Sequence, residues 1–280
     1  PAAAELPDRA HIRRDVPIPK PPFLGSRVIE RVKLEAILPY INESVLFKFQ
    51  WQFKQRSMPK DEYWRFIERE VRPIYLDIIR KCKAEDLIQP RAVYGYYECQ
   101  SEGDDVILYR PHASEVLHRF TFPRQKKLKR LCIADFFRST TSGEKDVIAF
   151  TVVTVGQKAS DTEKIWFKEN RYRDYLYLHG FSVECAEALA ELLHKQVRGE
   201  LGISGDDSRE IEDLFRQGYR GSRYSFGYPA CPRLEDQAPL LEILDARRIG
   251  VELSEGFMLE PEQSTSALVV HHPQAKYFGV

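Results

Sequence analysis

Apolar and polar positions alternate with two different periods, and the change of period divides the chain into helical and strand-rich parts. Apolar residues recur at near-helical spacing over residues 28–41 and again from Lys60 to Lys83, where Pro73 is expected to kink or divide the helix. Between Arg91 and Val155 the period is close to two, and residues 101–104 carry a hairpin signal. The apolar stretches 116–122, 131–137 and 147–156 predict further strands of a mainly antiparallel sheet.

Helical spacing returns between Ser160 and Arg198, with a break expected near Gly180 and an apolar stripe after it. Short helices are predicted over residues 208–217 and 240–246, and a strand over residues 267–271. The segment 220–237 is rich in glycine and proline and is predicted to be an irregular loop. Residues 46–53 form an aromatic run that is expected to be buried. Helices and strands in separate runs predict an α+β fold.

The N-terminal residues differ in composition from the rest. Residues 1–26 hold six of the seventeen prolines, which predicts an extended linker or wrapping arm ahead of a domain over residues 27–280. The missing initiator Met suggests a fragment of something longer. The chain lacks an apolar run that could cross a membrane or serve as a signal peptide, so a cytoplasmic location is expected.

Composition and charge exclude several classes of protein. Hydrophobic residues make up 43% and charged residues 30%, and the 42 Lys and Arg residues balance the 42 Asp and Glu residues, as in ordinary globular proteins. Five cysteines without a CxxC pair argue for reduced, mostly buried thiols rather than a disulfide framework or zinc site. The basic stretch 118–130 could contact an acidic partner or nucleic acid, but a solvated hairpin is the simpler interpretation.

Two segments could form a binding site. In Arg223–Pro232, RYSFGYPACP, an arginine suited to a carboxylate precedes a Gly-Tyr-Pro turn, although a rigid surface loop explains the pattern as well. Tyr277 and Phe278 could stack on a base or pack as an edge strand. Nucleophilic and phosphate-binding motifs are absent from the sequence.

Metal binding has weak support. Glu187 and Glu191 lie one turn apart, and Glu191 with His194 gives a single E-x-x-H, which is half of a di-iron pattern. Surface charges, with Glu191 and Lys195 as an i,i+4 pair, are the simpler interpretation. The adjacent His271 and His272 would face opposite ways on a strand. We therefore predict no metal site.

RYSFGYPACP and the later HHPQAKYFGV together resemble the activation domain of cobalamin-dependent methionine synthase, which binds S-adenosylmethionine. YINESVLFKFQWQF, LIQPRAVYGYY, IADFF and AEALAELLHKQVR also match, so the resemblance runs from about Tyr40 to the C-terminus. It implies a C-shaped single domain with a curved, mainly antiparallel sheet flanked by helices.

The resemblance also implies ligand-binding residues. Arg223 corresponds to the carboxylate anchor, the backbone of residues 224–228 faces adenine and ribose, and Glu187 lies near the ligand's positive end. The full set of matched positions is Arg223, Gly227, Tyr228, Ala230, Tyr277, Phe278, Asn42 and Glu187. Asn42 stands where the family often has an Asp that receives the ammonium group, so affinity is expected to be lower unless Glu43 substitutes.

The implied role is reactivation of a methyltransferase. In the family, this domain presents the methyl group of S-adenosylmethionine to inactive cob(II)alamin on an adjacent module, with an electron from flavodoxin or a similar reductase. The sequence has no D-x-H-x-x-G segment, so cobalamin must be held by the partner module and the isolated chain is not expected to turn over. The alternatives are a non-catalytic module that senses S-adenosylmethionine or docks a protein, and a nucleic-acid binder.

Overall fold

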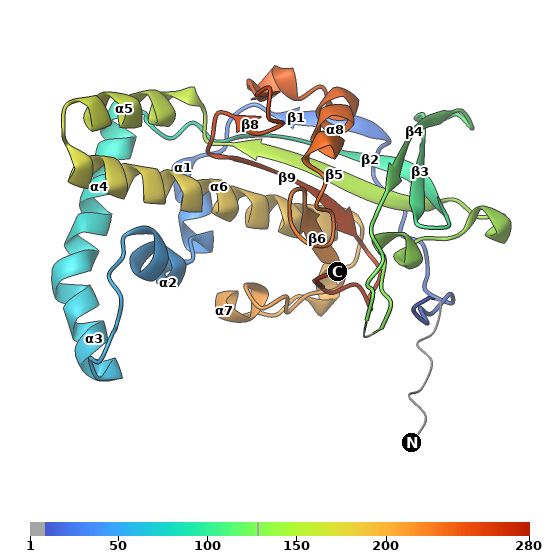
Figure 1. The fold of residues 1–280 in the computed structure, drawn as a ribbon, viewed down its shortest axis with the longest axis horizontal. Helices are drawn as coiled ribbons and strands as arrows, with labels where there is room; N and C mark the ends of the chain where they lie inside the picture. Colours follow the sequence, from blue (N-terminus) through green and yellow to red (C-terminus); the bar gives the residue numbers. More distant parts are fainter. Residues whose placement is uncertain (1–8, 128) are drawn as a thin grey trace.

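A curved antiparallel sheet forms the centre of the computed structural model, which describes residues 9–127 and 129–280 (Figure 1). Its order is β4-β3-β2-β5-β9-β6, and β1 pairs with β2 beside β3, because the 12-residue β2 is long enough for both. The strands are β1 Gly25–Ile29, β2 Arg91–Glu102, β3 Asp105–Tyr109, β4 Val116–Thr121, β5 Asp146–Thr154, β6 Ser222–Ser225 and β9 Ser264–Val270. A separate pair, β7 Glu252–Leu253 and β8 Leu259–Glu260, lies outside this sheet.

Helices cover both faces of the sheet. The principal helices are α3 Lys60–Phe66, α4 Arg72–Glu85, α5 Gln157–Lys168, α6 Tyr172–Glu200 and α8 Gln237–Leu244. Shorter helical segments are α1 Leu34–Ile37, η1 Leu38–Tyr40, α2 Glu43–Val45, η2 Leu46–Gln50, η3 Ile67–Val71, η4 Ile133–Phe136, η5 Thr140–Ser142, η6 Ser204–Asp206, α7 Ile211–Leu214, η7 Leu234–Asp236 and η8 Ala246–Ile249. At the two ends of α6, the α2–α4 helices and the α7 segment extend to the same side, which gives the C-shaped outline (Figure 1).

The alternation along the strands separates two hydrophobic cores. Tyr94 and Tyr96 of β2 pack with α4 and α6, whereas Val93 and Tyr97 face the opposite layer with α8. This is the period of two that the sequence shows, since successive strand side chains point to opposite faces. All five cysteines are free and buried, as predicted.

Several predicted elements are confirmed, and the others differ for identifiable reasons. The hairpin at residues 101–104 joins β2 to β3, and the helix from Lys60 is divided just before α4, whose second residue is Pro73. Residues 28–29 are strand rather than helix because they pair with Val93 and Ala92 of β2. Residues 133–136 form the 3₁₀ segment η4 instead of a strand.

The break between the two long helices was predicted at the wrong position. The chain turns at residues 169–171, and Gly180 lies inside α6. A Cβ at Gly180 would lie 2.7 Å from the Cβ of Gln50 and 2.9 Å from the Trp51 ring. This glycine therefore permits close packing of two segments rather than a turn.

The aromatic run is only partly buried, because Phe47 and Trp51 are in the core while Phe49 is 65% exposed. In the predicted N-terminal arm, residues 9–24 have no regular structure but pack on the body, with Ile12 and Val16 buried. Pro1 and Pro7 of this arm, and Leu128 of the basic stretch, lie outside the described residues.

Candidate functional site

Arg223 lies on an edge strand, although the sequence predicted that this residue would lie in an irregular loop. β6 pairs with the last four residues of β9, and Arg223 stands opposite Val269. Its neighbour Tyr224 is fully buried in the α8 layer, so the alternation of the strand directs Arg223 to the other face, toward α6. The short strand was missed because glycines and prolines on both sides dominate its sequence signal.

Two carboxylates of α6 face the Arg223 guanidinium. Its Nη2 lies 3.8 Å from Oε2 of Glu187, whose side chain is about half exposed, and its Nη1 lies 3.5 Å from Oε2 of the buried Glu191. Both distances exceed those of hydrogen bonds. Arg223 is therefore held by charge while its donors remain available to a ligand carboxylate.

The turn after β6 presents Tyr228 to solvent. Gly227 has a φ of +86°, its N–H donates to the carbonyl of Cys231 at 2.9 Å, and a Cβ there would lie 2.7 Å from Leu234. Only glycine fits this position without strain. Tyr228 is 56% exposed, whereas Ala230 is completely buried, so Ala230 can offer a ligand no exposed side chain.

The C-terminal segment is fastened beside β6. Tyr224 donates its hydroxyl to the Lys276 carbonyl at 2.8 Å and stacks on the ring of Tyr277, which is 42% exposed. The Tyr277 N–H donates to Oε1 of Gln217. Phe278 instead packs against Phe136 and Tyr224 in the core, 7% exposed, so it supports the site rather than facing it.

Asn42 caps α2, one of the helices in the group α2–α4. Its Oδ1 accepts from the Val45 N–H at 3.2 Å, at the start of α2. Glu43, considered as its substitute, accepts from Nη1 of Arg72 at 2.5 Å. In this conformation no hydrogen bond or ion pair joins either residue to Arg223 among the described residues, so their role toward a ligand stays a prediction.

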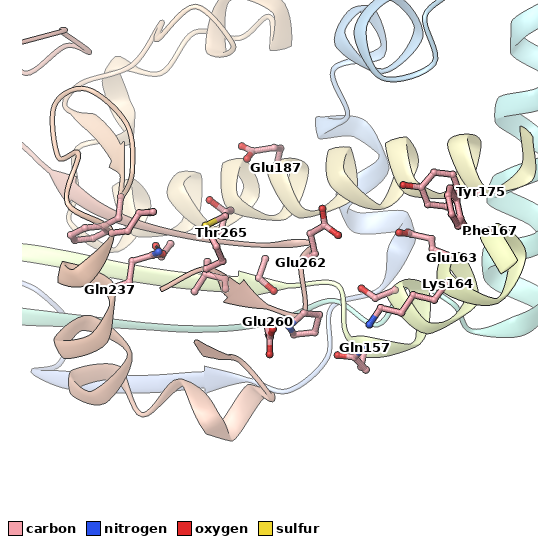
Figure 2. Close-up of a pocket in the computed structure, with 18 of the residues that line it drawn as sticks. Gln157, Glu163, Lys164, Phe167, Tyr175, Glu187, Gln237, Glu260, Glu262 and Thr265 are labelled. Carbon is pink, nitrogen blue, oxygen red and sulfur yellow. The ribbon is translucent and has the colours of Figure 1, made fainter. Parts of the chain in front are cut away.

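A cavity of about 900 Å³ adjoins Glu187 and extends along α5, α6 and the edge of β9 (Figure 2). Of the predicted residues, Glu187 and Tyr228 line it. The volume lies in the range of pockets for small molecules. In Figure 2, Glu163, Phe167 and Tyr175 lie together at the end formed by α5 and α6, away from Glu187.

That far end contains a hydrogen-bonded cluster. Oε2 of the buried Glu163 lies 3.0 Å from Nδ1 of His179 and accepts from Gln263 at 3.0 Å. The hydrogen bond to Glu163 raises the pKa of His179. This cluster has a structural role, because it joins α5 and α6 to the residue that precedes β9.

Sequence reasoning missed three charged residues behind Arg223. Glu191, predicted as a surface residue paired with Lys195, is 6% exposed, and Arg198 and Asp207 continue the charged row inward. Burial raises the pKa of Glu191, and the charges of Arg223 and Arg198 oppose that effect. The available signal was a pair of charged residues, Glu191 and Arg198, seven apart on the same side of a helix.

Other candidate features of the sequence have structural roles. In the basic stretch, Arg124 is buried between Asp104 and Asp135, and Arg119 pairs with Glu102 and Asp105. His271 contacts Asp146, whereas His272 lies near the Arg13 carbonyl, so the two histidines diverge as expected. Within residues 9–127 and 129–280, no cluster of three or more metal-ligating side chains occurs.

Residues 33–280 match the family described as the vitamin B12 dependent methionine synthase activation domain. The chain belongs to this family. Across 99% of its length, this activation domain is 43% identical to the methionine synthases of Mycobacterium tuberculosis and Mycobacterium leprae. It spans about a quarter of the length of these relatives, 24% in both cases.

The fold of this activation domain is also known from a solved structure. A crystal structure of the MetH reactivation domain bound to AdoHcy superposes with a TM-score of 0.81 and 27% sequence identity. The match covers 99% of this chain and 84% of the other. None of the helices in the described part of this activation domain is long and apolar enough to span a membrane.

Proposed function

We propose that this activation domain binds S-adenosylmethionine beside Arg223 and presents its methyl group to cobalamin held by an adjacent module of methionine synthase. The observation that carries the proposal is Arg223 itself: a mostly buried guanidinium on an edge strand that donates no side-chain hydrogen bond within the described residues, with its Nη2 on the side of the half-exposed Glu187. Such a fork is suited to the carboxylate of the ligand.

The other predicted residues fit distinct parts of this ligand. Glu187 offers a carboxylate to its positive end, and Tyr228 and Tyr277 offer partly exposed aromatic faces. Gly227 and Ala230 shape the turn so that its backbone approaches the ligand closely. Asn42, which caps α2, remains the candidate partner of the ammonium group.

The reaction that we assign to the assembled enzyme needs one methyl group and one electron. Cobalamin held by the adjacent module would supply the cobalt that accepts the methyl group of S-adenosylmethionine. The electron would come from flavodoxin or a similar reductase, and AdoHcy (S-adenosylhomocysteine) would be the product that leaves. This domain contributes orientation, because holding the two reactants in line removes much of the entropic barrier. We place this activity in the cytoplasm.

Titration calorimetry with S-adenosylmethionine and AdoHcy tests the proposal. Arg223→Ala should weaken both ligands tenfold or more, since a charge-assisted hydrogen bond contributes about 1.5–3 kcal/mol. Arg233→Ala is the matched control, because Arg233 follows the same turn but is 59% exposed and pairs with Asp236. Absence of saturable binding by the unmodified chain, or equal affinities of the two variants, would contradict the proposal.

A further inference from the structure

A row of alternating charges runs from the interior to the candidate site. Nε and Nη2 of Arg198 donate to the two carboxylate oxygens of Asp207 at 2.8 and 2.9 Å. Nη1 of Arg198 lies 3.9 Å from Oε1 of Glu191, whose Oε2 lies 3.5 Å from Nη1 of Arg223. Arg223 then meets the half-exposed Glu187, so the order is Asp207, Arg198, Glu191, Arg223, Glu187.

The inner half of this row is sealed from water. The Arg198 side chain is completely buried, and its guanidinium lies 4.1 Å from the centroid of the Tyr219 ring. His194, also fully buried, packs edge-on against the same ring. Burial and the two arginines lower the pKa of His194 well below its usual range, so this histidine adds no competing positive charge at neutral pH.

The bonding within the row is unequal. Arg198 and Asp207 form a bidentate pair that fixes both groups, whereas Glu191 contacts its two arginines at distances longer than hydrogen bonds. Glu191 Oε1 and Arg223 Nη1 have no hydrogen-bond partner among the described residues. The inner end of the row is therefore rigid, and the end that reaches Arg223 is held by charge.

From this arrangement we infer that Glu191 is a positioning residue for ligand binding. Its buried carboxylate holds the inner side of the Arg223 guanidinium, and Arg198, which Asp207 fixes in place, supplies a second counter-charge to that carboxylate, so that the outer side of Arg223 faces the ligand. This inference rests on the proposed function, because it assumes that Arg223 receives the ligand carboxylate. Beyond the proposed function, we infer that the buried carboxylate of Glu191 determines the orientation of the Arg223 guanidinium.

Comparing the affinities for two ligands distinguishes a positioning role of Glu191 from a general structural role. AdoHcy carries the amino-acid carboxylate, whereas 5′-methylthioadenosine keeps the adenine, ribose and thioether but lacks that carboxylate. Glu191→Gln preserves the shape of the side chain and removes its charge. We expect it to weaken AdoHcy about tenfold in calorimetric titration and to change the affinity for 5′-methylthioadenosine less than twofold.

Two further variants complete the experiment. Asp207→Asn acts on the same row from its far end and should weaken AdoHcy in the same direction by a smaller factor, while the exposed Glu212→Gln should leave both affinities unchanged. Equal losses for both ligands in Glu191→Gln, or no loss for AdoHcy, would overturn the inference. Failure of the unmodified chain to bind AdoHcy would instead overturn the proposed function.

Discussion

Two arginines of this activation domain occupy similar settings and are bonded differently. Arg124 and Arg223 each lie between a buried carboxylate and a partly exposed one. Arg124 donates to Asp135 at 2.6 and 2.8 Å and to Asp104 at 2.7 and 3.0 Å, whereas the carboxylates nearest to Arg223 lie 3.5 and 3.8 Å away.

The difference separates a structural arginine from one that can bind a ligand. Arg124 also donates to the Arg130 carbonyl at 2.6 Å, so its guanidinium is largely occupied by the fold itself. Arg223 is attracted by charge and donates no side-chain hydrogen bond within the described residues, so its Nη2, on the side of the half-exposed Glu187, retains free donor capacity. Composition and burial alone do not distinguish the two, because the distinction lies in how many hydrogen bonds are already made.

The largest expected loss of stability follows substitution of Arg124, whose hydrogen bonds are made within the fold. Arg124→Ala leaves the carboxylate of Asp135, which is 4% exposed, without its main partner and should lower the free energy of unfolding by about 3–5 kcal/mol. Urea denaturation measures this loss. Arg119→Ala, which breaks an exposed pair, should cost about 1 kcal/mol or less. If both variants lose a similar amount of unfolding free energy, Arg124 is no more important to stability than an exposed arginine, and its contrast with Arg223 does not hold.

Glu184 is a buried carboxylate without an arginine partner, so it shows what burial does to a carboxyl group when no such counter-charge is present. Glu184, buried one turn before Glu187, accepts from Gln50 at 3.2 Å, and burial raises its pKa to about 7. The folded protein then binds more protons than the unfolded chain between about pH 4.5 and 7, so its stability should fall as pH rises through this interval.

Glu184→Gln should therefore stabilise the protein by about 2–3 kcal/mol at pH 8 and by little at pH 4.5. Thermal or urea unfolding at both pH values measures the difference, with exposed Glu212→Gln as the control. A variant whose stability changes equally at both pH values would show that Glu184 does not titrate in this interval.

A substitution in the turn after β6, at Gly227, should lower stability by a smaller amount. Gly227→Ala introduces a Cβ at positive φ, 2.7 Å from Leu234, and should cost about 1–3 kcal/mol of stability and weaken AdoHcy. Gly103→Ala is the control, because it also has positive φ but no atom within 4 Å of the added Cβ. Denaturation and calorimetry of both variants show whether contact with Leu234, beyond the backbone conformation, matters for the site.

The smallest expected change in stability is that of Arg223→Ala. Glu191 keeps Arg198 as a counter-charge and Glu187 is half exposed, so the free energy of unfolding should fall by about 1 kcal/mol or less. The same variant should lose AdoHcy affinity, whereas folded Arg124→Ala should retain it. If Arg223→Ala destabilises the protein as much as Arg124→Ala does, the two arginines are equivalent and the comparison fails.

The sequence alone determined the features that depend on local chemistry. The period of two predicted β2, β3 and β5, Pro73 marked the division between η3 and α4, and Gly227 marked a turn that needs a positive φ. The motifs around Arg223 and Tyr277 also indicated the family, because both occur in order within the chain. Each of these signals depends on residues that lie close together along the chain.

Tertiary structure decided what depends on distant partners. Val28 became strand because β2 offered backbone partners, and Gly180 stayed in α6 because Gln50 and Trp51 pack against it. Glu191 became buried because Arg223, from a strand distant in sequence, joins Arg198 of the same helix as a counter-charge. The energy of a buried charge depends on which opposite charges the fold places within a few ångströms, and that information exists only in three dimensions.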